Sequence, residues 1–148
     1  LPFRDGSFAC VTAYAVLHHL LDARPTFREA YRVLAPGGVF YTDHDVNYFF
    51  ARFYQPVYRL THLRRAGFAG PDEDFAEYHN TQTAGLNPEV LASSLRKIGF
   101  RGVRVEYWHT RNPALSRPRR AALAALKALA QVTGGRSFHT HFRLIAEK

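Results

Sequence analysis

The apolar positions at the start of the chain predict a strand, a helix and a second strand. Residues 8–17 (FACVTAYAVL) form a nearly continuous apolar run rich in β-forming residues, preceded by the turn signal Asp5-Gly6-Ser7. Such a run is typical of a strand buried on both faces, as in a parallel sheet. In the helix that follows, Pro25 suits the first turn, and apolar side chains recur at helical spacing: Phe27, Ala30, Tyr31 and Leu34. Pro36-Gly37-Gly38 predicts the end of this helix, and Val39 to Thr42 is the second predicted strand.

A strand, a helix and a strand in succession form a βαβ unit, which places the two strands parallel. The carboxyl ends of both strands then lie at one edge of the sheet, where open α/β folds bind ligands. His18 and His19 follow the first strand, and Asp43, His44 and Asp45 close the second. We therefore expect both polar clusters to face the same crevice.

The rest of the chain predicts further α/β elements and one segment of different character. Residues 48–58 are crowded with aromatic side chains and predict one helix, and a polar stretch follows over residues 70–83. Asn87 and Pro88 predict the start of a helix that Gly99 ends. A third strand over Val103–Trp108, an Ala/Leu helix over residues 118–132 and a final strand over Phe138–Ala146 complete the pattern. The fold class is α/β, with a mostly parallel sheet.

Composition narrows the class of protein. The chain has 148 residues, 47% of them hydrophobic, and this excludes a disordered tail and a low-complexity linker. It contains one cysteine, so we expect no internal disulfide, no cysteine-based zinc site and a reducing cytoplasm. No apolar stretch is long enough for a transmembrane helix. The formal charge of +8 is weak evidence for a nucleic-acid partner, and we expect none. Since the chain starts at Leu1 and has no methionine, we expect it to be the back part of a longer protein.

Several short motifs in the first 45 residues occur together in the order and spacing of one family. They are Leu1-Pro2-Phe3, Ser7-Phe8, Leu17-His18-His19, and Arg32-Val33-Leu34 with Pro36-Gly37-Gly38. In this respect the chain resembles the class I S-adenosylmethionine-dependent methyltransferases, and most closely the group of ubiquinone/menaquinone-biosynthesis C-methyltransferases. One position departs from the family, since Ala9 stands where an acidic residue usually follows the Phe of the Ser-Phe motif.

The resemblance implies a Rossmann-like fold, truncated at its N-terminus, in which this chain begins just before the fourth of seven strands. The last strand would be antiparallel and lie beside the second strand of this chain, in the spatial order first, second, fourth, third, which leaves Phe8–Tyr14 at an edge. The glycine-rich loop and the acidic residue that binds the ribose would lie outside this chain. Residues 1–148 would be the C-terminal part of one methyltransferase domain, comprising strand–helix–strand (1–45), an aromatic insert (46–86) and closing helices and strands (87–148).

The resemblance also implies site residues. S-adenosyl-L-methionine would be contacted by Leu1, Ala13, Tyr14 and Ala15, with the Tyr14 ring near the sulfonium cation. The candidates that face the substrate are His18, His19, Asp43, His44 and Asp45, one of which could deprotonate a phenol, enol or amine. The alternatives are that the histidines cap or pack, and that the aspartates satisfy loop amides. His139 and His141 are expected to be structural or solvated, and no residue is expected to bind a metal.

The implied function is methyl transfer to a small apolar or aromatic molecule. Residues 46–60 would form an aromatic lid over the substrate, with an interfacial helix or ordinary core packing as the alternatives. A different class of function stays open, namely a non-catalytic binding or scaffold module that retains the fold. Without the implied glycine-rich loop, the fragment alone is expected to be inactive. Neither the methyl acceptor nor the oligomeric state can be deduced from the sequence.

Overall fold

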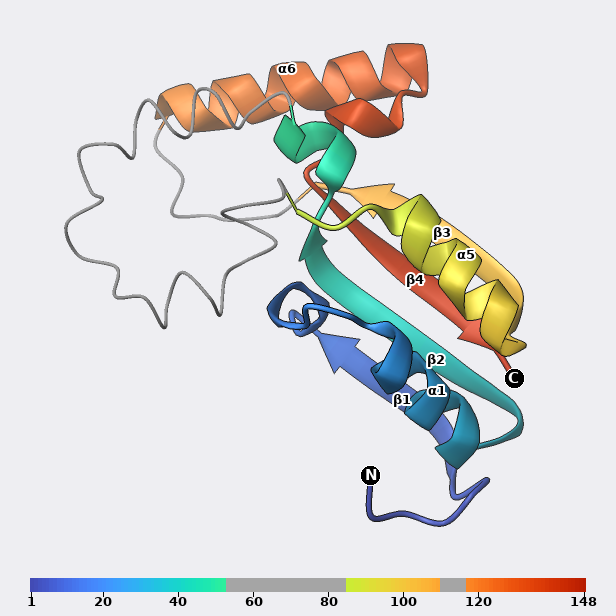
Figure 1. Cartoon of the computed structure of the whole chain (residues 1–148). Helices are drawn as coiled ribbons and strands as arrows, with labels where there is room; N and C mark the ends of the chain where they lie inside the picture. The colour runs from blue at the N-terminus through green and yellow to red at the C-terminus, as the bar shows by residue number, and fades with distance from the viewer. Residues whose placement is uncertain (53–84, 110–116) are drawn as a thin grey trace, which may run out of the picture.

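The computed structural model describes residues 1–52, 85–109 and 117–148. These residues form a four-stranded sheet of order β1-β2-β4-β3, with helices packed against it (Figure 1). The strands are β1 (Phe8–Tyr14), β2 (Leu34–Val46), β3 (Arg101–Trp108) and β4 (His141–Glu147). The predicted spatial order first, second, fourth, third is therefore confirmed, and so is the position of β1 at an edge.

The expectation of a mostly parallel sheet is wrong for the described residues. β1 pairs with β2 in parallel, but β4 runs antiparallel to both β2 and β3. The physical reason is that the antiparallel last strand is inserted inside the sheet, where it makes two pairings. With only four strands, two of the three pairings are then antiparallel, and the sheet is mixed.

Local sequence signals account for the helices next to the sheet. Helix α1 (Arg24–Val33) has proline in its first turn, as predicted, but Leu34 begins β2 instead of continuing the helix. Helix α5 (Pro88–Ile98) starts at Asn87, whose side chain accepts hydrogen bonds from the amides of Glu89 and Val90, and Gly99 caps its end with a φ of 123°.

Three shorter or later elements complete the described chain. They are the 3₁₀ turns η1 (Leu17–His19) and η2 (Arg136–Phe138), and helix α6 (Arg117–Thr133). Residues 48–52 are helical directly after β2, which agrees with the start of the helix predicted in the aromatic segment. Most of that segment, residues 53–84, lies outside the described residues. No helix in the described part of the chain is long and apolar enough to cross a membrane.

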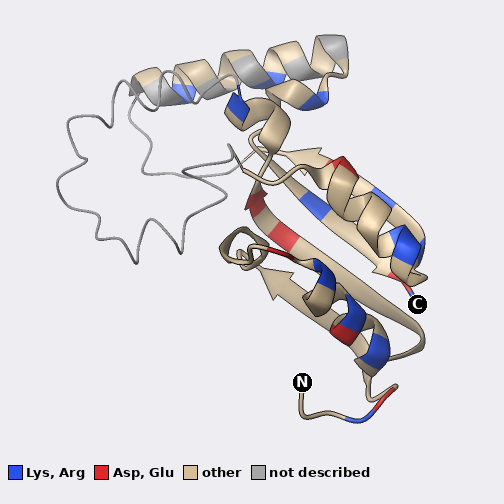
Figure 2. Ribbon diagram, viewed as in Figure 1, with Lys and Arg blue, Asp and Glu red and all other residues tan. Residues whose placement is uncertain are grey.

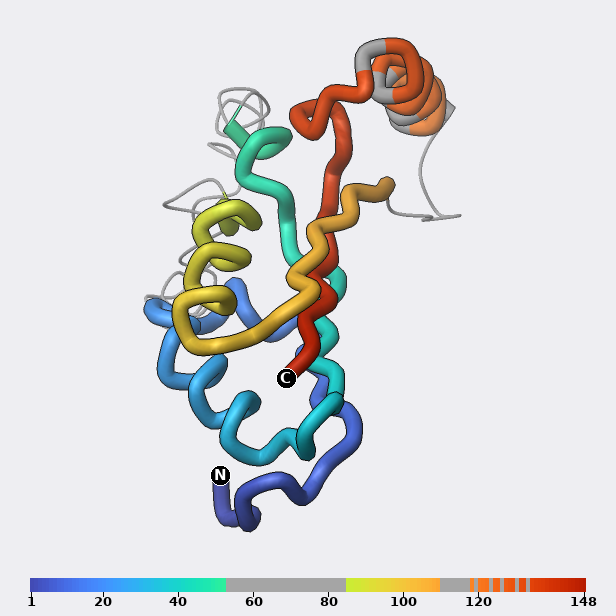
Figure 3. Tube along the Cα trace, turned by 90° about the vertical axis from the view of Figure 1, so that its right-hand side faces the viewer, coloured from blue at the N-terminus to red at the C-terminus, as the bar shows by residue number. Residues whose placement is uncertain are grey.

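The hydrophobic core lies between one face of the sheet and helices α1 and α5, which cover that face side by side (Figure 3). Phe40 of β2 and Phe142 and Leu144 of β4 point into it, where they meet Phe27 of α1 and Leu95 of α5. All five side chains are almost completely buried. We call this face of the sheet the covered face, and the opposite face the open face.

Burial of β1 on both faces, as its apolar run suggested, is also wrong. Val11 and Ala13 face the core, whereas Cys10, Thr12 and Tyr14 alternate with them and are exposed. The reason is that β1 is an edge strand and that α1 and α5 lie on the same side of the sheet. An apolar composition does not distinguish a strand with two covered faces from one with a single covered face.

Candidate active site

A β-bulge near the end of β2 determines where the polar side chains at this edge of the sheet point. Thr42 pairs with Leu144 and Asp45 pairs with Phe142, so β2 contains one more residue than β4 between these two pairs. His44, inside the bulge, has a backbone φ of 69°, a value that residues other than glycine rarely adopt. Paired residues share a face of a sheet, so Asp45 lies on the covered face with Phe142.

The covered face carries a buried histidine–aspartate pair. His18 Nδ1 lies 2.9 Å from Asp45 Oδ1, and the backbone N–H of His18 donates to the same oxygen at 3.2 Å. Asp45 is 0% exposed and His18 is 9% exposed. The turn η1 follows β1 and the bulge follows the body of β2, so the two residues meet although they lie 27 positions apart in the chain.

Electrostatics make this pair chemically notable. Burial raises the pKa of the Asp45 carboxyl, and the hydrogen bonds from His18 oppose that rise. Asp45 Oδ2 is buried and has no hydrogen-bond partner among the described residues. When Asp45 is ionised, the ring N–H at Nδ1 of His18 donates to it, and Nε2 then carries the lone pair that can accept a proton.

The open face carries a cluster of aromatic and imidazole rings at the same end of the sheet. The His44 ring lies 4.2 Å from the Tyr14 ring and 4.6 Å from the Trp108 ring, measured between centroids. Trp108 in turn stacks on His141 at 5.0 Å. Burial, followed by the nearby charge of His44, lowers the pKa of His141 to about 4. The Tyr14 side chain remains 62% exposed and presents an aromatic face to solvent.

Asp43 connects the two strands at this edge. Its carboxylate accepts hydrogen bonds from the Tyr41 hydroxyl at 2.8 Å and from the His44 amide at 2.8 Å. Its carbonyl accepts from the amide of Ala15 at 2.9 Å, and Ala15 has a φ of 50°. Ala15 and His44 are the non-glycine residues with positive φ in the described part of the chain, and both lie at this edge.

The structure thus brings the two predicted polar clusters to one edge but divides them between the two faces of the sheet. His18 and Asp45 are in contact on the covered side, while Asp43 and His44 lie with Tyr14 on the open side. Asp43 makes the loop-amide contact that was the alternative to a substrate-facing role.

The other predicted site residues are placed as follows. His19 is exposed, with its ring 4.0 Å from that of His18. Leu1 is 63% exposed, and its amino group pairs with Glu29 at 2.7 Å. Ala13 points into the core, so only its backbone is oriented toward the open face. The roles of these residues stay predictions.

Trp108 was not predicted to lie in the site, and His141 was predicted to be structural or solvated. Both residues join the ring cluster because Trp108 ends β3 and His141 begins β4, and antiparallel pairing brings these ends together. In the sequence, Trp108 lies at the end of one predicted strand and His141 lies within the next. To predict that their rings meet, one must know how β3 and β4 pair, and no short segment of the sequence shows this pairing. In the described part of the chain, no group of three or more His, Cys, Asp or Glu could hold a metal ion.

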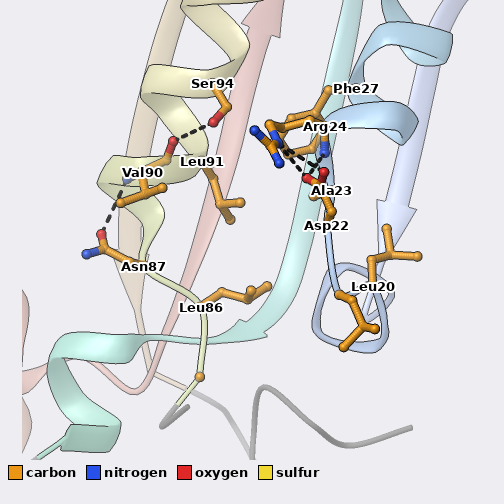
Figure 4. Close-up of a pocket in the computed structure, with 12 residues that line it drawn as sticks. Leu20, Asp22, Ala23, Arg24, Phe27, Leu86, Asn87, Val90, Leu91 and Ser94 are labelled. Carbon is orange, nitrogen blue, oxygen red and sulfur yellow. Dashed lines mark hydrogen bonds and ion pairs between the residues drawn. The ribbon is translucent and has the colours of Figure 1, made fainter. Parts of the chain in front are cut away.

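A cavity of about 330 Å³ opens between the segment that leads into α1 and the start of α5 (Figure 4). Leu20, Leu21 and Phe27 line it from one side, and Leu86 and Leu91 from the other. It is mainly apolar, although the ion pair between Asp22 and Arg24 lies at its wall, with nitrogen–oxygen distances of 2.8 and 3.0 Å.

Comparisons with known proteins agree with this architecture. Residues 1–42 match the family described as "Methyltransferase domain". No curated protein matches the chain significantly. Among solved structures, a SAM-dependent methyltransferase from Thermotoga maritima is 16% identical with a TM-score of 0.56, and the match covers 100% of this chain and 59% of that one. An S-adenosylmethionine-dependent methyltransferase from Mesorhizobium loti is also 16% identical, with a TM-score of 0.56, and the match covers 100% of this chain and 65% of that one. Phosphoethanolamine N-methyltransferase 2 of Haemonchus contortus, solved with S-adenosyl-L-methionine, is 19% identical with a TM-score of 0.52, and the match covers 99% of this chain and 34% of that one.

Residues 1–42 are thus similar in sequence to a methyltransferase domain, and the chain shares its fold with solved SAM-dependent methyltransferases. The chain spans 59% of the length of the Thermotoga maritima enzyme. The matched region ends at residue 42, directly before the Asp43-His44-Asp45 segment that forms the bulge.

Proposed function

We propose that the protein containing this chain transfers a methyl group from S-adenosyl-L-methionine to a small apolar or aromatic molecule, and that it is related to the ubiquinone/menaquinone-biosynthesis C-methyltransferases. The observation that carries the proposal is the methyltransferase-domain match over residues 1–42, on a chain that folds as these enzymes do. The activity and the substrate are proposed for the whole protein, of which the resemblance implies that this chain is the C-terminal part.

The open face fits the cofactor in one respect that can be checked on the residues present. Tyr14 offers an exposed aromatic face next to His44, and Ala15 is small, so a cationic sulfonium group could approach the ring closely. Tyr14 and Ala15 are therefore the residues that would contact the cofactor at this edge. Leu1 and Ala13 are further contacts that the resemblance alone implies. When bound, the cofactor supplies an electrophilic methyl group on sulfur.

His18 is the residue that we assign as general base. A weakly nucleophilic acceptor, such as a phenol or an enol, must lose a proton as its oxygen or carbon bonds to the methyl group. His18 Nε2 would accept that proton, while Asp45 holds Nδ1 at 2.9 Å and stabilises the positive charge that forms. Residues 46–60 are proposed to cover the acceptor as an aromatic lid.

The proposal is tested with the full product of the gene that encodes this chain. S-adenosylhomocysteine formation is measured with phenolic, enolic and amine acceptors. His18→Gln should lower kcat for phenolic and enolic acceptors by about 10²–10⁴-fold and leave cofactor affinity unchanged. Asp45→Asn should cause a smaller loss, because the base remains but its orientation is no longer fixed. His19→Gln, at the exposed neighbouring candidate, should lower kcat less than His18→Gln if His18 is the base.

Two results would count against the proposal. Absence of both cofactor binding and product with the full gene product would favour a non-catalytic module that retains the fold. Normal turnover by His18→Gln would show that another group accepts the proton. For the 148-residue chain alone we expect no measurable heat of cofactor binding in calorimetry, because the glycine-rich loop implied by the resemblance is not among its residues.

A further inference from the structure

A groove between helices α1 and α5, on the side away from the sheet, combines an apolar end with a basic end. The apolar end is the cavity of about 330 Å³ shown in Figure 4. The basic end is a second cavity of about 580 Å³, lined by Arg24, Arg28, Tyr31, Ser94, Lys97 and Ile98. Arg24 and Ser94 line both cavities, so the two adjoin. We refer to the whole as the α1–α5 groove.

The apolar end is a hollow with a buried floor, and its rim is also apolar. Phe27 is completely buried and Leu91 is 9% exposed, so these side chains form its floor. Leu21 and Val90 line the same cavity but are 58% and 60% exposed. Large apolar side chains exposed on two sides of one cavity mark a site for an apolar group.

The basic end carries uncompensated positive charge. Arg24, Arg28 and Lys97 contribute three positive charges, and Asp22, paired with Arg24, contributes one negative charge, so the net charge is +2. The hydrogen bonds from Arg24 lower the pKa of the Asp22 carboxyl, and the nearby charge of Arg28 adds a smaller effect. No carboxylate is among the described residues that line the basic end. In Figure 2, basic residues are visible along α1 and at the end of α5.

We propose that the α1–α5 groove binds an acidic amphiphile as a single molecule, with a carboxylate at Arg28 and Lys97 and an alkyl chain in the apolar cavity. Charge complementarity selects the anionic head, and the cavity between Phe27, Leu91 and Leu21 selects the chain. Because the site is a hollow, it fits a single ligand that inserts into it. A flat bilayer surface would instead contact an exposed helix face. His18 and Asp45 do not line the groove, so this site does not depend on the proposed methyl transfer.

Calorimetry on the 148-residue chain tests the proposal with decanoate below its micellar concentration. Decanoate should bind, whereas decanol, which lacks the charge, and acetate, which lacks the chain, should each bind at least about tenfold more weakly. The double variant Arg28→Gln/Lys97→Gln should weaken decanoate binding by about tenfold. The matched control Arg101→Gln/Arg104→Gln removes the same charge from exposed positions of β3, and it should bind like the unchanged chain.

Several outcomes would overturn the proposal. The first is absence of decanoate binding. The second is equal binding of decanoate and decanol, and the third is an equal loss in the two double variants, which would indicate nonspecific attraction to a basic protein. Cosedimentation with phosphatidylglycerol vesicles that excess decanoate does not reverse would instead indicate a membrane-surface site. Because every readout is binding to the chain itself, these failures differ from a failure of methyl transfer.

Discussion

Replacing His141 with glutamine should remove much of the pH dependence of this chain's stability. His141 is the first residue of β4 on the open face, where its ring stacks on Trp108 and its Nδ1 lies 2.8 Å from the Thr140 hydroxyl. Burial lowers its pKa from 6.5 to about 4, and the charges of His44 and His109 add to this effect while Asp43 opposes it. The folded chain therefore resists protonation of this ring.

The sign and the size of the effect follow from the two pKa values. Between pH 6.5 and about 4 the unfolded chain binds a proton at His141 that the folded chain does not bind. The free energy of unfolding is therefore highest above pH 6.5 and falls as the pH is lowered. The interval between the pKa values corresponds to roughly 3 kcal/mol in total, of which about 2 kcal/mol is lost by about pH 5.

Urea denaturation between about pH 7.5 and about pH 4.5, followed by Trp108 fluorescence and circular dichroism, measures this loss. The change in unfolding free energy over this range should be about 2.5 kcal/mol smaller in His141→Gln than in the unchanged chain. The comparison uses the pH dependence of each chain, so a constant loss from the missing ring stack does not affect it. His19→Gln removes an exposed histidine and serves as the control. A His141→Gln variant whose pH dependence matches that of the unchanged chain would refute the reasoning.

Three backbone predictions can be measured by the same denaturation at neutral pH. Asn87→Ala removes the cap hydrogen bond to the Glu89 amide and should cost about 1 kcal/mol, so an unchanged midpoint would contradict the capping role. Gly38→Ala places a Cβ 2.8 Å from the Ala35 carbonyl oxygen and should cost about 1–3 kcal/mol, whereas a neutral result would mean that the backbone moves aside easily. Ala15→Gly relieves a φ of 50° and should stabilise the chain by up to about 1 kcal/mol, whereas destabilisation would show that this conformation is not strained.

Local chemistry made the helices predictable. Asn87, Pro88 and Gly99 act on neighbouring backbone groups, so the start and end of α5 could be read from the sequence. The end of α1 was misplaced because Leu34 fits the helical spacing equally well as the first residue of β2. The spacing of apolar residues does not show which element a boundary residue joins.

Properties that depend on distant partners were predicted less well. The resemblance to methyltransferases implied that the last strand is antiparallel and lies inside the sheet, and this is correct. The description of the sheet as mostly parallel was wrong, because two of its three pairings are antiparallel. Likewise, residues 8–17 indicate a strand but not how many of its faces are covered. Val11 is partly buried and Thr12 is exposed because α1 and α5 both lie on one side of the sheet. The sequence of β1 itself does not show on which side these helices pack.

The same distinction applies to the candidate site. That His18 and Asp45 lie at one edge followed from the βαβ unit, because parallel strands bring their carboxyl ends together. That they touch, and that His44 does not join them, depends on the extra residue of β2 opposite β4. A register shift of one residue moves a side chain to the other face of a sheet, and it leaves no local signal in the Asp43-His44-Asp45 sequence.

The left-handed residues at this edge suggest why the bulge matters. Ala15 and His44 each adopt a positive φ that costs a residue other than glycine about 1–2 kcal/mol. Both flank one interaction, the hydrogen bond from the Ala15 amide to the Asp43 carbonyl, so the strain is concentrated where β1 and β2 end. A regular β2 would place Asp43 and Asp45 on the same face, and the buried pair of Asp45 with His18 could not coexist with the His44–Tyr14 contact on the open face. Backbone strain of this kind is typically retained at functional sites. It is therefore consistent with the proposal that this edge of the sheet, where the His18–Asp45 pair and the Tyr14–His44 contact meet, belongs to the functional site.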